Sequence, residues 1–386
     1  MKKSYFAKIV LVLISLSVFT CFLWGCTEKA AEENILEGLD THANYDVSFI
    51  KKLGNYKALA VEKDISVTED DILSYYEGCI DNIVALCDFT EEEPVTDGLF
   101  DELVALTGRT DARDGDYICF DYKGIQDGEA FSGGTATYTC TRLGAGNFIP
   151  GFEEGIIGHS IGESFSIDVT FPEEYFSEDL AGQAVIFEIY IHYIFPGITD
   201  DSVKVINKYN DSISSETVEV PSYETEEEFR TYVRTNLKEE LETSFDENLD
   251  STVIYTLYLE TEFDEFPQEQ IDSFKSSVEA AAEGYGIDTM TYLYYCYGIY
   301  TDEEFDELAK YQVATRGLIA AVVQAENMTV TEAEYNNYCA YAVETYGYES
   351  ISDLESSVSK DNICNSLLSE RVLNLIEDNM VVTTIE

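Results

Sequence analysis

An alternation of apolar and polar residues runs from Gly115 to Phe195 and constrains the fold more than any other feature of this sequence. In "YICFDYKG", "SFSIDVTF" and "AVIFEIYIHY", every second side chain is apolar, as expected for strands that bury one face. Turn signals separate these segments, among them Asp127-Gly128 and Gly133-Gly134. The pattern therefore predicts a compact antiparallel sheet domain.

The chain after Pro196-Gly197 has the pattern of helices. A threonine three residues before a glutamate, the spacing of an N-terminal capping box, occurs at Thr225, Thr301 and Thr331. Pro267 stands where another helix would begin. We therefore expect an α+β protein in which an all-α domain, residues 197–386, follows the sheet domain.

Residues 27–112 precede the sheet domain, and we expect three parts in them. The first, over about 27–50, is a polar tether. A short strand and a helix follow, and Thr68 with Asp71 has capping-box spacing at the start of that helix. Residues 88–112 are expected to form an acidic loop. We expect the strand and helix of this segment to pack with the helical domain.

Residues 1–26 resemble a bacterial lipoprotein signal peptide. Three lysines form a basic start, and the apolar stretch 9–23 carries no charge. This stretch is shorter than the roughly 20 residues that a spanning helix needs. "LWGC" resembles a lipobox in which Cys26 is acylated and becomes the mature N-terminus, although a tryptophan replaces the usual small residue. The alternative is an uncleaved anchor. With either, we expect the rest of the chain outside the cytoplasm, attached to the outer face of the cell membrane.

The formal net charge of −54, from 22 Lys and Arg against 76 Asp and Glu, restricts the possible partners. A surface this acidic repels phosphate backbones, so nucleic acid is not an expected partner. A hydrophobic content of 45% argues against a disordered acidic chain. Seven of the nine cysteines lie beyond the signal and form no CxxC pair. We interpret most of them as small buried hydrophobic side chains and leave the question of disulfides open.

Most catalytic and cofactor-binding motifs are missing from the sequence. The three histidines, His42, His159 and His192, are isolated, and there is no HExxH, GxSxG, Walker or zinc-finger spacing. We therefore expect no cofactor and no metal. What remains is the apolar cluster in "NFIPGFEEGIIGHSIGE", residues 147–163, where bulky side chains surround Pro150.

The motifs around this cluster are similar to those of the FKBP-type peptidyl-prolyl isomerase domain, particularly the version in trigger factor. "GDYICFDYKGIQDGEAFSGG", "LGAGNFIPGFEEGIIGHSIGE" and "FPEEYFSEDLAGQAVIFEIYI" occur in the family's order. The resemblance implies an FKBP-like antiparallel sheet wrapped on a short helix over residues 113–196. Residues 200–386, with "FDEFPQEQI" and "TVTEAEY", resemble the family's helical chaperone domain. The ribosome-docking domain with its GFRxGxxP loop has no counterpart, so a ribosome is not an expected partner.

The resemblance also implies a pocket formed by eight residues. Phe152 would be its floor, Ile149 would offer its backbone N–H to a bound peptide, and Tyr175 would offer its hydroxyl to the prolyl carbonyl. The eight residues carried over by position are Tyr122, Phe131, Phe148, Ile149, Phe152, Tyr175, Leu180 and Phe187.

Two positions depart from the family pattern. Ser132 stands where many relatives have an acidic residue, and Thr139 stands at an aromatic position, with Tyr138 one place early. A shift by one residue turns a side chain to the other face of a strand, so one wall of the pocket would be thinner or rebuilt. We interpret His159 as a rim or hydrogen-bonding residue.

The resemblance implies a peptidyl-prolyl cis-trans isomerase and chaperone for unfolded or nascent exported polypeptides that contain X-Pro bonds. Rotation about such a bond needs no acid, base or nucleophile, so an apolar pocket suffices. Two alternatives stay open. One is a holdase chaperone that keeps the isomerase fold only as a scaffold, which the changes at Ser132 and Thr139 favour. The other is a surface adhesin or ligand-binding lipoprotein that uses its 28 tyrosines as a recognition face.

Overall fold

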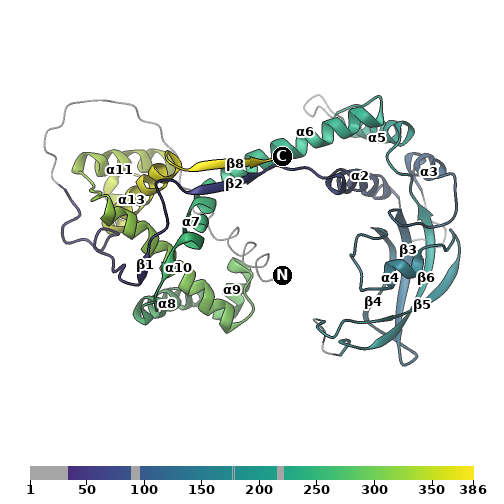
Figure 1. Cartoon of the computed structure of the whole chain (residues 1–386), viewed down its shortest axis with the longest axis horizontal. Helices are drawn as coiled ribbons and strands as arrows, with labels where there is room; N and C mark the ends of the chain where they lie inside the picture. The colour runs from purple at the N-terminus through teal and green to yellow at the C-terminus, as the bar shows by residue number, and fades with distance from the viewer. Residues whose placement is uncertain (1–33, 88–95, 176, 178, 215–220) are drawn as a thin grey trace. The chain divides into compact units, whose positions relative to one another are not determined.

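The computed structural model describes residues 34–87, 96–175, 177, 179–214 and 221–386 (Figure 1). The chain divides into two compact units, residues 1–65 with 241–386 and residues 66–240. The predicted signal peptide and Cys26 lie outside the described residues. Within the described ranges, no helix combines the length and the apolar character needed to cross a membrane.

A four-stranded antiparallel sheet in the order β4-β3-β6-β5 forms the core of the unit that contains residues 66–240. Buried and exposed residues alternate along β6, as the sequence predicts. The short helix α4, Phe152–Ile156, packs on the buried face, where Phe152 and Ile156 meet Ile167. The expected α+β fold, with a sheet wrapped on a short helix, is confirmed. The strands are β3 (Tyr117–Gln126), β4 (Glu129–Arg142), β5 (Ser164–Thr170) and β6 (Ala184–Ile194).

Helices build a second hydrophobic cluster in the same unit. They are α2 (Glu69–Val84), α3 (Gly98–Ala105), α5 (Asp200–Ile213) and the start of α6 (Glu226–Glu247). Helix α3 corrects the prediction of a loop over 88–112. Asp97 accepts a hydrogen bond from Leu99 at its N-terminus, and Phe100 and Leu103 are buried. Eight residues hold too few helical turns for the apolar spacing to be recognised in the sequence.

The boundary predicted at Pro196-Gly197 does not separate the two compact units. Phe195 and Phe229 belong to one cluster with Tyr76, and the hydroxyl of Tyr76 donates a hydrogen bond to the carbonyl of Pro196 at 3.1 Å. The division falls instead inside α6, between residues 240 and 241. Aromatic packing across the predicted boundary is the reason for this difference.

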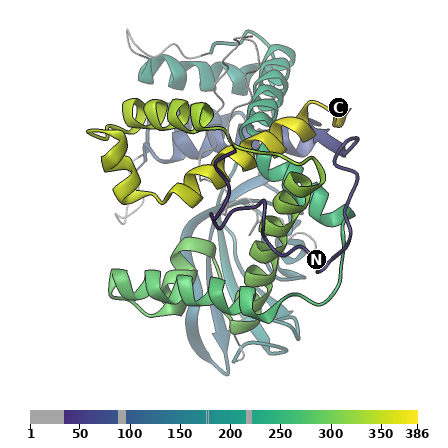
Figure 2. The ribbon, with the colours of Figure 1, turned by 90° about the vertical axis from the view of Figure 1, so that its left-hand side faces the viewer.

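The other unit is mostly helical. Figure 2 shows α8 and α9 at one end of it and α11 to α13 at the other. The capping boxes predicted at Thr301 and Thr331 are present, and α8 begins directly after Pro267. Its helices are α7 (Leu249–Glu260), α8 (Gln268–Tyr285), α9 (Thr289–Tyr297), α10 (Asp302–Ala325), α11 (Glu332–Tyr346), α12 (Ile351–Ser357) and α13 (Lys360–Glu377).

The described part of the predicted tether is packed into this unit. Leu36 and Phe49 are buried, with 7% and 3% of their surface exposed. Strand β1 (Ile50–Lys52) pairs with β7 (Glu262–Phe263), and β2 (Ala60–Asp64) pairs in parallel with β8 (Val381–Ile385). These long-range contacts divide the segment 27–112, because β2 belongs to this unit and α2 to the other.

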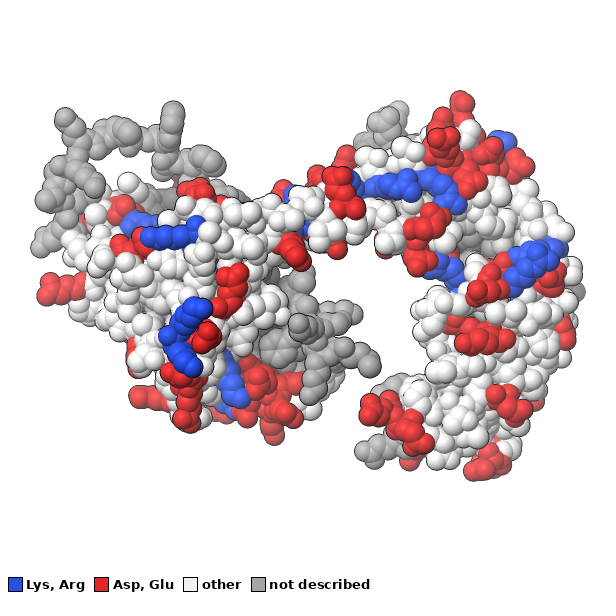
Figure 3. Space-filling view, viewed as in Figure 1, with Lys and Arg blue, Asp and Glu red and all other residues white. Residues whose placement is uncertain are grey.

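Acidic side chains lie over the surface of both units on the face shown in Figure 3. The seven cysteines of the described residues are free thiols. Cys119, Cys339 and Cys364 are buried, in line with their interpretation as small apolar side chains, whereas Cys296 is exposed.

Candidate functional site

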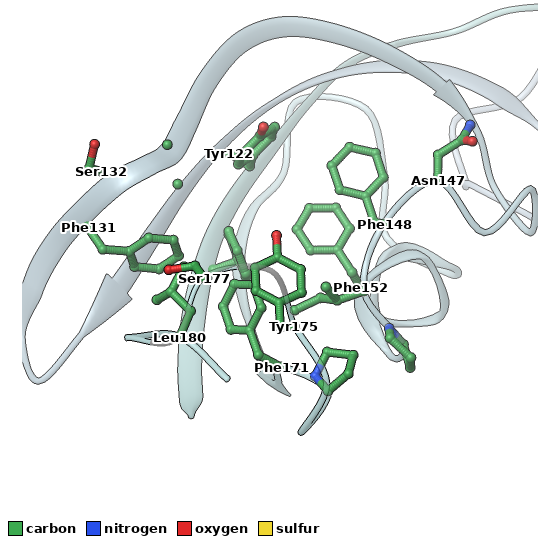
Figure 4. A pocket seen from close by; sticks show the side chains of 16 residues that line it. Tyr122, Phe131, Ser132, Asn147, Phe148, Phe152, Phe171, Tyr175, Ser177 and Leu180 are labelled. Carbon is green, nitrogen blue, oxygen red and sulfur yellow. The ribbon is translucent and has the colours of Figure 1, made fainter. Parts of the chain in front are cut away.

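A cavity of about 540 Å³ opens on the sheet next to α4 (Figure 4). Its volume falls within the roughly 300–1,000 Å³ that is typical of small-ligand sites. The structure brings all eight predicted residues together around it. Eight further residues line the cavity beyond the predicted eight, and of these only Ser132 was related to a pocket wall from the sequence. They are Ser132, Gly133, Gly134, Asn147, Pro150, Phe171, Pro172 and Ser177.

The floor of the cavity is a stack of aromatic rings. Phe152 has 1% of its surface exposed, and its ring lies parallel to that of Phe148 at a centroid distance of 4.4 Å. Phe187 meets Phe152 edge to face at 4.9 Å, and Tyr122 does so at 5.8 Å. Edge-to-face and offset contacts are the favoured arrangements of aromatic pairs. The rings therefore fix one another in place and leave an open space above them.

Two glycines allow Phe131 to form the side wall. A Cβ atom at Gly124 would lie 2.4 Å from ring atoms of Phe131, and one at Gly134 would lie 2.5 Å away. The ring thus lies directly over the backbone of β3 and β4 and points into the cavity (Figure 4). Gly124 of "YKG" and Gly134, the second glycine of "FSGG", are needed here because a side chain at either position would displace this ring.

The opposite rim comes from the loop between β5 and β6. Phe171 lies 4.6 Å from the ring of Tyr175, measured between centroids, and Leu180 packs nearby against the same core. Tyr175 and Leu180 remain partly exposed. Phe171 was missed, although it is the last apolar residue of the alternating segment "SFSIDVTF". Its place in that pattern was the available signal.

Glu153 holds the loop that carries Phe148. This carboxylate has 4% of its surface exposed and accepts hydrogen bonds from four backbone N–H groups at 2.7 to 3.1 Å. Hydrogen bonds to an ionised acceptor are among the stronger ones in proteins. Sequence reasoning missed this role, and the available signal was an acid directly after a glycine-rich loop. The donors are Gly144, Gly146, Asn147 and Phe148.

The backbone N–H of Ile149 is available as a hydrogen-bond donor for a ligand. Among the described residues, it has no hydrogen-bond acceptor, whereas the Ile149 carbonyl accepts the N–H of Phe152 at 3.1 Å. A backbone donor at the edge of an apolar cavity can bind a carbonyl group of a ligand. This geometry fits the role that the resemblance implies for Ile149.

The chemistry available in the cavity is limited. Of its described lining residues, none is Asp, Glu, Lys, Arg, His or Cys. No group of three or more His, Cys, Asp or Glu residues suited to a metal ion occurs in the described ranges. The site can therefore desolvate, orient and hydrogen-bond a ligand, and its hydroxyls and backbone groups are the polar atoms that remain.

The two departures from the family pattern have different outcomes. Ser132 does line the cavity, but its hydroxyl points away from the rings (Figure 4). Neither Thr139 nor Tyr138 is among the lining residues. Tyr138 instead stacks on His192 with centroids 3.9 Å apart and has a positive φ of 49°. The register shift in the β3–β4 ladder nearby places this ring outside the cavity.

His159 also lies outside the cavity. Its Nδ1 is 2.9 Å from a carboxylate oxygen of Glu163, and its ring stacks on Phe165 at 3.6 Å. The structure therefore gives it a hydrogen-bonding partner, as the sequence interpretation expected.

Comparisons with known proteins match both parts of the chain. The family model of FKBP-type peptidyl-prolyl cis-trans isomerase matches residues 108–192, and that of the bacterial trigger factor C-terminus matches residues 225–378. Trigger factor of Bacillus mycoides is 31% identical over 336 residues, which cover 85% of this chain and 72% of that protein. The chain belongs to the trigger factor family.

Other trigger factors show similar agreement. That of Limosilactobacillus fermentum is 28% identical over 338 residues, covering 85% of this chain and 70% of that protein. A solved structure of the trigger factor chaperone matches over 85% of this chain and 72% of that chain, with 14% identity. The TM-score of this match is 0.29. The cavity lies within the part that matches the FKBP-type family. By its family, the chain is a trigger factor-like chaperone with an FKBP-type domain.

Proposed function

We propose that this protein is a peptidyl-prolyl cis-trans isomerase and chaperone for exported polypeptides, and that the cavity over Phe152 is its active site. The observation that carries the proposal is an open, uncharged, aromatic cavity with a backbone donor at its edge, the N–H of Ile149, which no acceptor of the described residues binds. A prolyl ring fits such a cavity chemically, since it is apolar and has no N–H to satisfy.

The reaction needs no covalent chemistry. Amide resonance creates a barrier of about 18–20 kcal/mol and places negative charge on the carbonyl oxygen. Water stabilises this planar, charge-separated form more than the twisted one. A cavity that removes water from the prolyl amide therefore favours the twisted form, and the barrier falls. A reduction of about 4 kcal/mol would accelerate the rotation about a thousandfold.

Three groups have distinct roles in this mechanism. The stacked rings of Phe148 and Phe152 exclude water beneath the proline. The N–H of Ile149 orients the peptide by binding one of its carbonyl groups. The hydroxyl of Tyr175, on the opposite rim, donates to the prolyl carbonyl.

An isomerase assay on a tetrapeptide with a cis X-Pro bond tests the assignment. Phe152→Leu keeps an apolar side chain but removes the ring, and Tyr175→Phe removes only a hydroxyl. We expect both to lower kcat/KM, the first at least tenfold. Phe165→Leu is the matched control, because Phe165 lies in the same sheet but does not line this cavity. If all four proteins turn over the peptide equally, the site is assigned wrongly.

A holdase without isomerase activity is the second candidate. The observation that favours it is the position of Tyr138, which stacks on His192 and packs against the second hydrophobic cluster, so that the cavity lacks that aromatic wall. Suppression of aggregation of a proline-free client, together with no isomerase activity in the unaltered chain, would favour this candidate.

The resemblance of residues 1–26 to a lipoprotein signal peptide supports a proposal about where the protein acts. We propose that Cys26 is acylated and that the chain works at the outer face of the cell membrane, with neither ribosome nor nucleic acid as a partner. Cys26→Ser should abolish incorporation of labelled palmitate, whereas an uncleaved anchor would predict no palmitate in the unaltered chain. Cosedimentation of the unaltered chain with ribosomes would contradict the partner assignment.

A further inference from the structure

Cys119 on β3 and Cys140 on β4 lie directly opposite each other in the antiparallel ladder. The register around them is regular, since it runs without a break from Tyr117 opposite Arg142 to Phe120 opposite Thr139. Side chains of directly opposite residues point to the same face of a sheet. The two sulfur atoms therefore share one face, where both side chains pack against the same hydrophobic cluster.

The hydrogen bonds at the end of the ladder show whether Cys119 and Cys140 form a hydrogen-bonded or a non-hydrogen-bonded pair. The N–H of Leu143 donates to the carbonyl of Asp116 at 2.9 Å, so this opposite pair is hydrogen-bonded. Hydrogen-bonded and non-hydrogen-bonded pairs alternate along an antiparallel ladder. Cys119 and Cys140 lie three positions further along, which makes them a non-hydrogen-bonded pair.

The backbone hydrogen bonds between β3 and β6 also indicate that Cys119 and Cys140 are a non-hydrogen-bonded pair. The carbonyl of Tyr117 accepts the N–H of Phe195, next to β6, at 2.9 Å. Backbone groups two residues apart on a strand point the same way, so Cys119 also directs its backbone toward β6 rather than toward Cys140.

Non-hydrogen-bonded pairs have the closer spacing. Their Cα atoms are about 4.5 Å apart, within the roughly 4.4–6.8 Å that a disulfide requires. The neighbouring Cys140 thiol, through a hydrogen bond, and then burial raise the pKa of the Cys119 thiol. Cys140 is partly exposed, whereas Cys119 has 1% of its surface exposed.

We propose that Cys119 and Cys140 form a cross-strand disulfide when the protein meets a thiol–disulfide oxidant. The oxidant is a small disulfide or the disulfide of an oxidoreductase. The partly exposed Cys140 thiolate attacks it, which releases one thiol and leaves a mixed disulfide. The Cys119 thiol then loses its proton, its sulfur attacks the Cys140 sulfur, and the second thiol leaves. One oxidant disulfide is reduced to two thiols, and the protein loses two hydrogen atoms.

The bond would join the two strands that carry one wall of the cavity. Gly124 and Phe131 lie further along the same ladder, beyond its register shifts. The bond would therefore restrict opening of the ladder and stabilise the sheet domain. This inference does not depend on isomerase activity, since it concerns only the geometry of the ladder.

Peptide mapping of the full chain tests the proposal. The folded chain is equilibrated with a mixture of oxidised and reduced glutathione, alkylated in denaturant, digested without reduction and analysed by mass spectrometry. We expect a linked peptide pair that contains Cys119 and Cys140, and a midpoint of thermal unfolding about 10 °C above that of the reduced chain. Alkylation of both residues in the equilibrated chain, or a linkage of either to another cysteine instead, would overturn the proposal.

Two variants test whether the Cys119–Cys140 disulfide, and not cysteine substitution in general, causes the change in stability on oxidation. Cys140→Ala changes the partly exposed member and should remove both the linked pair and the dependence of stability on oxidant. Cys296→Ala removes an exposed cysteine in the other unit and should change neither. A stability increase on oxidation that persists in Cys140→Ala would show that another bond is responsible.

Discussion

The carboxylate of Glu153 lies 3.1 Å from the backbone nitrogen of Phe148, whose ring forms the upper layer of the aromatic stack. Three neighbouring N–H groups bind the same carboxylate, so one side chain of a five-residue helix orders the whole loop. The position of an apolar ring in the cavity thus depends on a buried charge.

We expect Glu153→Gln to destabilise the sheet domain by about 2 kcal/mol, because an amide N–H₂ would replace an acceptor that faces N–H donors. Isomerase activity should fall with it, since the loop carrying Phe148 loses its anchor. Chemical denaturation and the tetrapeptide assay measure the two effects. Glu154→Gln is the control on the same helix: Glu154 is exposed and caps Gly151 through one oxygen, which glutamine retains. Equal losses in both variants would contradict the role of Glu153.

Gly124→Ala should close part of the cavity. The added methyl group would meet Phe131 at 2.4 Å and Phe187 at 2.9 Å, so the Phe131 ring must move. We expect KM for the tetrapeptide to rise several-fold while the chain still folds, since Phe131 is only partly buried. Gly78→Ala is the matched control. Nothing lies within 4 Å of a Cβ at this exposed position of α2, so it should stabilise the chain by up to about 1 kcal/mol. A Gly124→Ala variant with unchanged KM would show that Phe131 does not contact the substrate.

Glu377 predicts a pH dependence of the helical unit. Burial and a hydrogen bond with Asp250 raise the pKa of Glu377 to about 7 from its ordinary value of 4.5. Between these values the folded state binds more protons than the unfolded state, so the free energy of unfolding falls as the pH rises from about 5 to 8. Glu377→Gln keeps a neutral donor and should reduce that fall, with a higher melting temperature than the unaltered chain at pH 8.

Thermal unfolding at pH 5 and pH 8 measures this difference. Glu344→Gln removes one negative charge from an exposed position of α11 and controls for the general effect of lower net charge. If both variants raise the melting temperature equally at pH 8, the Asp250 pair is not the cause.

Local patterns were readable directly from the residues. Thr301 and Thr331 cap their helices as predicted, because a capping box involves only residues three positions apart. The alternation along β6 likewise predicts its buried face, since neighbouring side chains of a strand point to opposite sides. The eight cavity residues came from the resemblance and not from periodicity, which assigns Phe187 to the core without distinguishing a pocket.

Other features required contacts between distant residues. Leu36 and Phe49 lie in a stretch that is polar on average, and their burial depends on helices more than 200 residues away in the chain. All five residues of strand β8 are exposed, and its ladder with β2 holds the strand in place. Helix α3 is too short for its apolar spacing to be distinguished from a loop.

The sequence by itself determined the alternating strands, the helix starts, the acidic surface and the family, because each depends on residue type or short-range spacing. Only the tertiary structure decided that the rings leave an open cavity, that Glu153 anchors its loop, and that Cys119 faces Cys140. These depend on strand register and on packing between elements, where a shift of one residue turns a side chain to the opposite face.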